Sequence, residues 1–422
     1  MHNVVIAPSV LNGSVTVPCS KSAAHRAILC AALADGESRL SPIAESNDIR
    51  VTAEAARALG AEITADGPVY RVSAGNAPQK SAEIDCGESG SSLRFLIPIC
   101  AAYGMQATFT GHGRLPERPI GIYLDLLPEH GVSCQTEGGL PLSINGMLKP
   151  GYFILPGNIS SQFITGLLLA CPLLEGNSII QLSSPLESAA YVDMTLEAMA
   201  AFGVTVESIE NGWRVPGGQN YHARDFRVEG DWSQAAFFLA ACALGGSLSI
   251  DGLKRNSIQG DRAAEALFAA FGAKTAWKGE TLCIEQKELY GMEIDAAQIP
   301  DLVPILATTA ALAKGRTRIY HAARLRIKES DRLAAMADGL NRLGAQVQET
   351  DDGLLIDGVE RLHGGTVEGC NDHRIVMALS IAALKADGPV TITDAESINK
   401  SYPAFFADYN RLGGKADVIS MG

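Results

Sequence analysis

The sequence predicts an α/β protein in which one βαβαββ unit is repeated six times with its helices inside. Six long apolar stretches recur about every 70 residues, and each begins at a residue of a type found at helix N-termini. These residues are Ser20, Ser89, Ser160, Asp231, Asp301 and Asn371. A second helix in each unit ends at a glycine: Gly60, Gly131, Gly203, Gly272, Gly344 and Gly413. Because a helix that is apolar on nearly all sides must be buried, we expect the first helix of each unit in the core.

The fourth and fifth units show the elements of the repeat in order. Residues 247–250 alternate between polar and apolar side chains, which is typical of a strand. Residues 261–271 place apolar side chains on one helical face, and Gly272 is the expected left-handed stop. In the fifth unit, residues 346–349 and 354–356 are strand-like runs joined by a turn. Each unit therefore reads as helix, strand, helix, strand, strand after a leading strand.

The six units divide most simply into two domains of three units each. The break falls near residues 226–230, and no low-complexity linker marks it. Residues 3–6 form a leading strand that we expect to join the C-terminal half, so that the chain crosses twice. The predicted domains are residues 20–228, and residues 1–19 together with 229–422. The period is too long for a short-repeat solenoid.

Charge and composition limit the function. The 422 residues carry a net charge of −13, which argues against a general nucleic-acid or anionic-membrane partner. Basic residues nevertheless gather at the polar clusters: Lys21, Arg26, Arg94, Arg118, Arg326, Lys328, Arg332, Arg374 and Lys400. Several helix N-termini aimed at one place would also favour an anion. We therefore expect the protein to bind and transform a multiply anionic small molecule.

The sequence also indicates a cytoplasmic protein. The N-terminus has no basic region followed by a long apolar core, so we expect no signal peptide. The apolar runs, about 12–16 residues long, are too short to span a bilayer. Nine cysteines are scattered without metal-type pairing, which fits reduced thiols better than a disulfide scaffold or a zinc site.

Several segments carry side chains that could hold an anion or hydroxyl groups. They contain Lys21, Ser22 and Arg26; Gly90 and Ser91; Arg118 in the loop 114–119; Ser160, Ser161 and Gln162; and Ser188 and Tyr191. Small residues let backbone N–H groups approach an oxyanion, and arginine suits carboxylate or phosphate. Taken singly, each segment is explained as well by an ordinary helix cap or a solvated loop.

The run 326–332 is the densest in charge. Lys328 and Arg332 are four residues apart, so we expect them on one face of a starting helix. A salt-bridged helix cap is the competing explanation. The candidate acids and bases are Asp301, Glu329, His373 and Lys400, and a carboxylate among cations should be ionised.

Together these clusters resemble the 5-enolpyruvylshikimate-3-phosphate (EPSP) synthase family, over residues 15–413. The resemblance is carried by Pro18-Cys19-Ser20-Lys21-Ser22 with Arg26, Gly90-Ser91 with Arg94, Glu117-Arg118-Pro119-Ile120, Ser160-Ser161-Gln162, Tyr191-Val192-Asp193, Pro300-Asp301, the run Arg326 to Arg332, and Asn371-Asp372-His373-Arg374. The order and spacing of the whole set make it specific. The resemblance implies an inside-out α/β barrel in two domains hinged around a cleft, the enolpyruvyl transferase fold.

The resemblance also implies a reaction and roles. The enolpyruvyl group of phosphoenolpyruvate would pass to the 5-hydroxyl of shikimate 3-phosphate, without metal or organic cofactor, in a monomeric cytoplasmic enzyme of aromatic amino-acid biosynthesis. Asp301 would take the hydroxyl proton, and Glu329 would protonate the methylene, helped by Lys21 or His373. Shikimate 3-phosphate would contact Lys21, Ser22, Arg26, Ser160, Ser161, Gln162, Ser188, Tyr191, Asp301, Arg324 and Lys328. Phosphoenolpyruvate would contact Lys21, Gly90, Ser91, Arg118, Gln162, Arg332, Arg374 and Lys400.

Two positions depart from the family pattern, and two other functions compete. Many relatives have Asn where this chain has Glu88 and Arg324. The sister enzyme, UDP-N-acetylglucosamine enolpyruvyl transferase, shares the fold and the donor. Its family has a Lys-Asn pair at the first cluster and a cysteine in the mobile loop of the second unit. Here Ser22 follows Lys21, and the loop 112–120 has no cysteine. A non-catalytic anion-binding scaffold would have no need of Asp301 and Glu329 among the cations.

Overall fold

The computed structural model describes residues 2–75 and 79–420, and they form two compact units. The N-terminal unit is Cys19–Val228. The C-terminal unit combines the chain before Cys19 with the chain from Glu229 onward. The chain therefore changes unit twice, after Pro18 and after Val228.

In the described residues, the N-terminal unit has three four-stranded sheets of one design. Each has one parallel pair followed by two antiparallel pairs, in the orders β16-β4-β6-β5, β7-β8-β10-β9 and β11-β12-β14-β13. The strands are β4 (Glu37–Ser41), β5 (Glu62–Asp66), β6 (Val69–Ser73), β7 (Ser81–Asp85), β8 (Gln106–Thr110), β9 (Val132–Gln135), β10 (Leu142–Gly146), β11 (Tyr152–Leu155), β12 (Ser178–Leu182), β13 (Glu207–Ile209), β14 (Gly212–Val215) and β16 (Asp225–Arg227), with a short extra pair, β3 (Ala34–Asp35) and β15 (Tyr221–His222).

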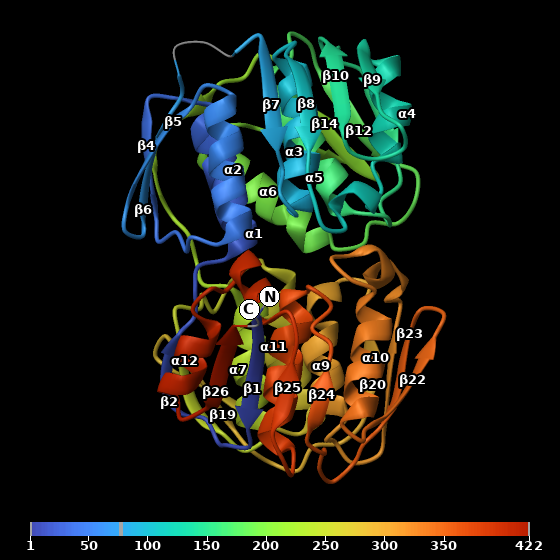
Figure 1. The fold of residues 1–422 in the computed structure, drawn as a ribbon. Helices are drawn as coiled ribbons and strands as arrows, with labels where there is room; N and C mark the ends of the chain where they lie inside the picture. Colours follow the sequence, from blue (N-terminus) through green and yellow to red (C-terminus); the bar gives the residue numbers. More distant parts are fainter. Residues whose placement is uncertain (1, 76–78, 421–422) are drawn as a thin grey trace. The chain divides into compact units, whose positions relative to one another are not determined.

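The helices of this unit supply its core. They are α1 (Lys21–Ala32), α2 (Asn47–Ala58), α3 (Gly90–Ala102), α4 (Gly121–Glu129), α5 (Ser161–Ala170) and α6 (Ala189–Ala201), with 3-10 turns η1 (Leu115–Glu117) and η2 (Cys171–Leu173). The first helix of each repeat, α1, α3 or α5, is buried over most of its length, and β7 and β8 lie in front of α3 (Figure 1). Ser20, Ser89 and Ser160 cap these helices, as the sequence predicts.

The C-terminal unit repeats the design, with β1 completing its last sheet. The sheet orders are β18-β19-β17-β2, β20-β21-β23-β22 and β24-β25-β1-β26. The strands are β1 (His2–Ala7), β2 (Asn12–Thr16), β17 (Ser247–Asp251), β18 (Lys274–Lys278), β19 (Thr281–Glu285), β20 (Glu293–Asp295), β21 (Arg316–Tyr320), β22 (Gln346–Thr350), β23 (Gly353–Asp357), β24 (Gly365–Val367), β25 (Val390–Ile392) and β26 (Lys415–Ser420).

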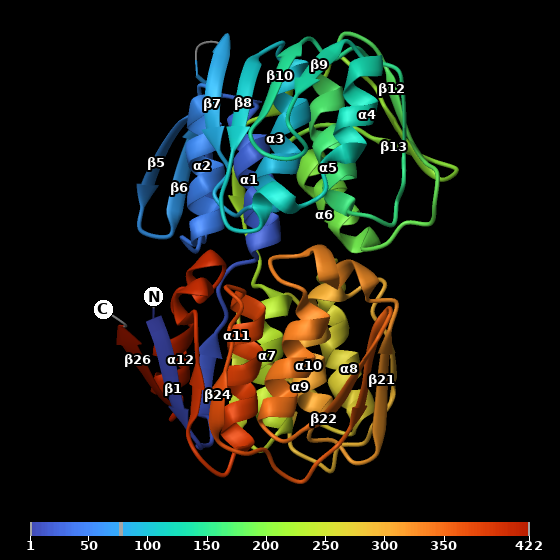
Figure 2. The ribbon, with the colours of Figure 1, turned by 45° about the vertical axis from the view of Figure 1, so that its right-hand side comes forward.

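The buried helices α7, α9 and α11 of this unit pack side by side (Figure 2). The helices are α7 (Trp232–Ala243), α8 (Ala263–Phe271), α9 (Val303–Ala310), α10 (Arg332–Arg342), α11 (His373–Ala382) and α12 (Phe405–Arg411), with 3-10 turns η3 (Gly260–Arg262), η4 (Pro300–Leu302), η5 (Ala323–Ile327), η6 (Ala383–Lys385) and η7 (Ala395–Lys400). In the described part, no helix combines the length and apolarity needed to cross a membrane.

Three local predictions in this unit are wrong. Asp301 does not cap α9: it lies in η4, where its carboxylate binds arginines instead. The cap of α11 is Asp372, not Asn371, since Asp372 accepts from the Arg374 N–H. Lys328 lies in extended backbone before α10, which begins at Arg332 because Asp331 caps it. Lys328 and Arg332 therefore do not share a helical face.

Candidate active site

The first set of candidate residues lies at the start of α1. Lys21 Nζ is 2.7 Å from Asp48 Oδ2 of α2, and both side chains keep some exposure. The nearby Arg26 is 3% exposed and donates to Thr195 Oγ1 (2.8 Å) and to the carbonyls of Tyr191 (2.8 Å) and Ser22 (2.7 Å). Burial lowers the pKa of Arg26 to about 10. Arg26 therefore ties α1 to α6, whereas Lys21 stays at the surface of the unit.

Gly90, at the start of α3, lies directly against the guanidinium of Arg118. A Cβ at Gly90 would lie 2.8 Å from the guanidinium carbon of Arg118, so Arg118 packs directly on the backbone of Gly90. Arg118 follows η1 in the loop 114–119 and is itself buried. Backbone N–H groups at a helix start and a guanidinium beside them are a favourable combination for an anion.

A chain of hydrogen bonds links α3 with α5. Arg94 Nη1 donates to Gln162 Oε1 (2.6 Å), and Gln162 Nε2 donates to Ser91 Oγ (2.9 Å). Arg94 also holds the carbonyl of Pro119, next to Arg118. The structure thus brings together three segments that are far apart in the sequence, namely α3, the loop 114–119 and α5, and the amide of Gln162 is oriented by partners on both its oxygen and its nitrogen.

The remaining candidates of this unit lie at the starts of α5 and α6. Ser160 caps α5 by accepting from the Gln162 N–H, and Ser161 is buried in its first turn. Ser188 precedes α6 with φ of 55°, a left-handed conformation that is strained for serine. Tyr191, in the first turn of α6, is partly buried. Strain of this kind is a feature often found at functional sites.

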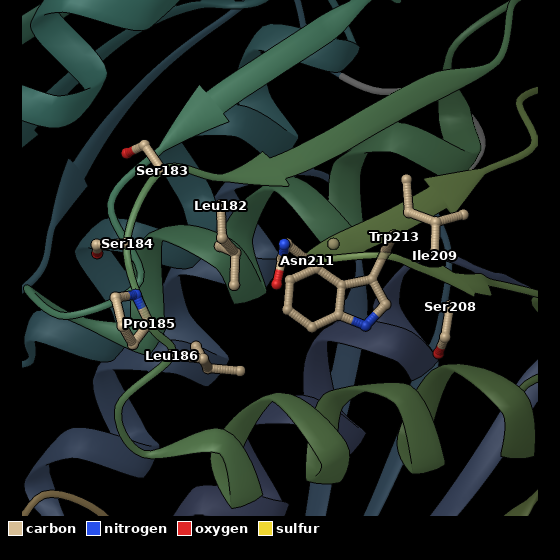
Figure 3. Close-up of a pocket in the computed structure, with 10 residues that line it drawn as sticks. Leu182, Ser183, Ser184, Pro185, Leu186, Ser208, Ile209, Asn211 and Trp213 are labelled. Carbon is tan, nitrogen blue, oxygen red and sulfur yellow. The ribbon is translucent and has the colours of Figure 1, made fainter.

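A shallow hollow with a volume of about 600 Å³ lies on the same unit and is not the anion site (Figure 3). Its lining is apolar, hydroxyl or amide in character: Leu182, Ser183, Ser184, Pro185, Leu186, Ser208, Ile209, Asn211, Gly212 and Trp213. The loop that lines it continues to Ser188, but no candidate cation is among the lining residues.

In the C-terminal unit, Arg332 is the centre of an ion network. Its guanidinium is 2% exposed and donates to Asp372 Oδ2 (2.8 Å), Glu329 Oε2 (2.8 Å) and Asp301 Oδ1 (3.1 Å). Burial opposes the charge, yet these three carboxylates outweigh it and hold the pKa of Arg332 above its usual value. The network joins η4, the start of α10 and the start of α11.

Asp301 is held by several cations. Arg374 Nη2 donates to its Oδ2 (2.9 Å), Arg332 Nη1 donates to its Oδ1 (3.1 Å), and Lys328 Nζ is 4.0 Å from Oδ1. Burial would raise the pKa of Asp301, but these cations overcome it and keep the pKa below the usual range. Asp301 is therefore ionised at neutral pH.

The pKa of Lys328 is shifted in the direction opposite to that expected for a lysine in an ion pair. Burial lowers the pKa of Lys328 to about 8, although Asp301 and Glu329 oppose that shift. Its side chain keeps 24% exposure, so it is accessible to a ligand. A lysine with this pKa changes charge within the pH range in which enzymes are usually assayed.

The last candidates surround this network. His373 is buried with Nδ1 3.8 Å from Asp372 Oδ1, and Lys400 donates to the carbonyl of Asn371 (2.5 Å). Arg324 donates to the carbonyl of Ala297. The sequence predicts no role for Asp372 or Asp48. The structure pairs Asp372 with Arg332 and Asp48 with Lys21. The signal for Asp372 lay inside the run 371–374, but its partner is 40 residues away.

Comparison with known proteins decides the family. A family model described as EPSP synthase (3-phosphoshikimate 1-carboxyvinyltransferase) matches residues 5–409. The chain belongs to the EPSP synthase family. It is 45% identical to a 3-phosphoshikimate 1-carboxyvinyltransferase of Clostridium acetobutylicum and 43% identical to one of Clostridium kluyveri, with full coverage of both chains.

Solved structures of EPSP synthases have the same fold as this chain. An EPSP synthase structure from Acinetobacter baumannii matches over all of both chains with a TM-score of 0.82 and 29% identity. The predicted fold class and the resemblance stated from the sequence are thereby confirmed. The match also decides against the sister enzyme and the non-catalytic scaffold.

Proposed function

We propose that this enzyme carries out the reaction of its family with one set of residues on each unit. The reaction transfers the enolpyruvyl group of phosphoenolpyruvate to the 5-hydroxyl of shikimate 3-phosphate and releases phosphate, in the shikimate pathway of aromatic amino-acid biosynthesis. The observation that carries the residue roles is the network in which Asp301, Glu329 and Asp372 share Arg332. We further expect the enzyme to act as a monomer in the cytoplasm.

Asp301 is the proposed base. Its low pKa means that it is ionised but weakly basic while Arg374 and Arg332 are paired with it. The carboxylate and phosphate of phosphoenolpyruvate would compete for the same guanidinium groups. Binding of the donor would therefore loosen the hold on Asp301 and raise its basicity, at the time when the 5-hydroxyl of the acceptor must lose its proton.

Glu329 is the proposed acid. C2 of phosphoenolpyruvate becomes electrophilic only as its methylene carbon gains a proton. Oxygen O5 of the acceptor then bonds to C2 and gives a tetrahedral intermediate. Loss of a methyl proton and of phosphate restores the double bond, with cations stabilising the charge on the leaving group. Lys21 and His373 are the candidates to assist these proton transfers.

The other candidate residues bind the substrates. Gly90, Ser91, Arg118, Gln162, Arg332, Arg374 and Lys400 would hold phosphoenolpyruvate, with Lys21 and Gln162 shared between the two substrates. Ser22, Arg26, Ser160, Ser161, Ser188, Tyr191, Arg324 and Lys328 would hold shikimate 3-phosphate. Arg26 would act through its carbonyl and hydroxyl partners, since its guanidinium donates to Thr195, Tyr191 and Ser22.

Phosphate release from phosphoenolpyruvate tests the reaction. Shikimate 3-phosphate is the acceptor, and UDP-N-acetylglucosamine is the parallel control. We expect release with shikimate 3-phosphate alone. Release with the nucleotide sugar alone would reject the proposal in favour of the sister reaction, and no release with either acceptor from folded protein would reject enolpyruvyl transfer.

A further inference from the structure

A row of buried polar side chains crosses three helices of the N-terminal unit. His25 Nδ1 of α1 is 2.6 Å from Thr52 Oγ1 of α2, and Thr52 Oγ1 is 2.7 Å from Ser92 Oγ of α3. Ser92 Oγ then donates to Ser89 Oγ (2.8 Å), and Ser89 caps α3. These four side chains, here called the buried wire, are at most 2% exposed. Buried polar groups in such a row specify one arrangement of the helices that carry them.

Thr52 Oγ1 has one proton and three polar neighbours, which are His25 Nδ1, Ser92 Oγ and the carbonyl of Asp48. The Asp48 carbonyl can only accept that proton, whereas in the contacts with Ser92 and His25 either partner can be the donor. Ser92 also has a single hydroxyl proton, which it can donate to Ser89. Burial, followed by the charges of Lys21 and Arg26, lowers the pKa of His25 well below 6.5, which keeps the ring neutral.

The wire connects two helix starts that carry proposed donor-binding groups. Lys21 begins α1, and Gly90 begins α3 directly after Ser89. Helix α2 packs on both, and its first turns hold each of them. Asp48 of α2 pairs with Lys21 (2.7 Å), and Thr52, one turn later, holds Ser92. The carbonyl of Asp48 also lies 3.2 Å from Thr52 Oγ1, so the ion pair and the wire share one turn of α2.

We propose that His25, Thr52 and Ser92 are positioning residues for the phosphoenolpyruvate site. They hold the first turn of α3, with Gly90 and Ser91, in fixed register with Lys21. The proposal rests on the proposed function for what binds there. None of the three needs to touch the donor, because each acts through the N-terminal turn of α3. The acceptor should be less affected, since its proposed contacts lie mostly on α5, α6 and the C-terminal unit.

Thr52→Val tests the wire with an isosteric loss of one hydroxyl. We expect KM for phosphoenolpyruvate to rise about tenfold, the effect of one buried hydrogen bond on a binding site. The kcat and KM for shikimate 3-phosphate should stay within about twofold. Thr309→Val is the matched control: Thr309 is also fully buried and also donates to the carbonyl four residues before it, but it lies in α9, outside the wire.

His25 offers a rescue experiment. Asn places an amide, which can donate or accept, near the position of Nδ1, whereas Leu fills the space without a polar group. We expect His25→Asn to keep the wild-type KM for phosphoenolpyruvate and His25→Leu to raise it as Thr52→Val does. Because either substitution leaves Thr52 and Ser92 in place, this pair still decides the question if Thr52→Val does not fold.

The same variants separate failure of the wire from failure of the function. An unchanged KM for phosphoenolpyruvate in both Thr52→Val and His25→Leu would overturn the proposal. So would an equal rise in Thr309→Val, which would indicate general loosening. If the wild type released no phosphate, inorganic phosphate would serve as the probe: its affinity, from calorimetric titration, should fall in Thr52→Val and not in Thr309→Val, and equal affinities would overturn the wire.

Discussion

Two buried arginines of the N-terminal unit, Arg26 and Arg94, have different kinds of partner from two buried arginines of the C-terminal unit, Arg332 and Arg374. In the N-terminal unit, Arg26 donates to hydroxyl and carbonyl oxygens, and Arg94 donates to the amide of Gln162 and a carbonyl. In the C-terminal unit, Arg332 and Arg374 are paired with carboxylates. Neutral partners fix a guanidinium without cancelling its charge, whereas carboxylates cancel the charge and add groups that can carry protons.

The difference assigns different tasks to the two units. A cation with neutral partners attracts an anionic substrate at all pH values of interest. An ion network instead holds acids and bases in defined protonation states until a ligand rearranges it. We therefore expect substitutions in the C-terminal network to reduce turnover most, and substitutions of neutral partners in the N-terminal unit to affect binding.

Glu329→Gln should have the largest effect. The amide can still accept from Arg332, so the network keeps its geometry, but it has no proton to deliver to the methylene carbon. We expect kcat to fall about a thousandfold, as for loss of a general acid. Phosphate release under saturating substrates measures it, and circular dichroism checks the fold. A folded variant with wild-type kcat would remove Glu329 from the mechanism.

Asp301→Ala should reduce kcat about a hundredfold, the usual loss for a missing general base. Affinity for phosphoenolpyruvate should change far less, because Arg332 and Arg374 lose a competing carboxylate and stay available to the donor. Steady-state kinetics with each substrate varied separates the two quantities. A large loss of phosphoenolpyruvate affinity at unchanged kcat would contradict the assignment and make Asp301 a binding group.

Arg332→Met and Arg26→Met compare the two kinds of partner directly. Both arginines are buried, and methionine fills much of the space that each occupies. Loss of Arg332 leaves Asp372 buried without its main counter-charge, which should cost about 3–5 kcal/mol of unfolding free energy. Loss of Arg26 strands only neutral oxygens, which should cost about 1–3 kcal/mol.

Urea denaturation at pH 7 measures both free energies. Thr165 and Thr195 are already hydrogen-bonded to each other (2.9 Å), so both hydroxyls keep a partner when Arg26 is removed, which keeps the cost of that removal low. Equal losses in the two variants would mean that the charge of the partner does not matter at these sites, and the proposed division between the units would fall.

The repeat and its buried helices could be predicted because their signals are local. Ser20, Ser89 and Ser160 each cap a helix through an N–H two or three residues later, and Gly272 stops α8 in a left-handed conformation. Such contacts need nothing from the rest of the fold. The same signals give the period, and the period gives the six units.

The predictions fail where a side chain binds a residue that is distant in the sequence. Aspartate is a favoured residue at helix N-termini, but the carboxylate of Asp301 accepts from Arg332 and Arg374, which follow it by 31 and 73 residues in the sequence. The role of Asp372 is not predicted for the same reason, since its partner Arg332 precedes it by 40 residues. His25 sits in the middle of an apolar helix and gives no sequence signal at all, since its partner Thr52 belongs to another helix.

The smallest effect predicted concerns pH and Lys328. Its pKa is lowered by burial to about 8, so the free enzyme loses this positive charge as the pH rises through that value. If the charged form binds shikimate 3-phosphate, kcat/KM for that substrate should fall about eightfold between pH 7.5 and pH 9, following the protonated fraction. The sign is the opposite for stability: a lysine pKa below its unfolded value makes stability rise with pH between about 8 and 10.4.

Lys328→Arg is the matched control, because arginine stays charged throughout this range. We expect the variant to lose the decline in kcat/KM for shikimate 3-phosphate above pH 8, whatever its absolute rate. The ratio between pH 7.5 and pH 9, measured for both proteins under the same conditions, cancels any difference in geometry between the two side chains. An identical decline in both proteins would assign the titration to another group and remove Lys328 from the acceptor's binding contacts.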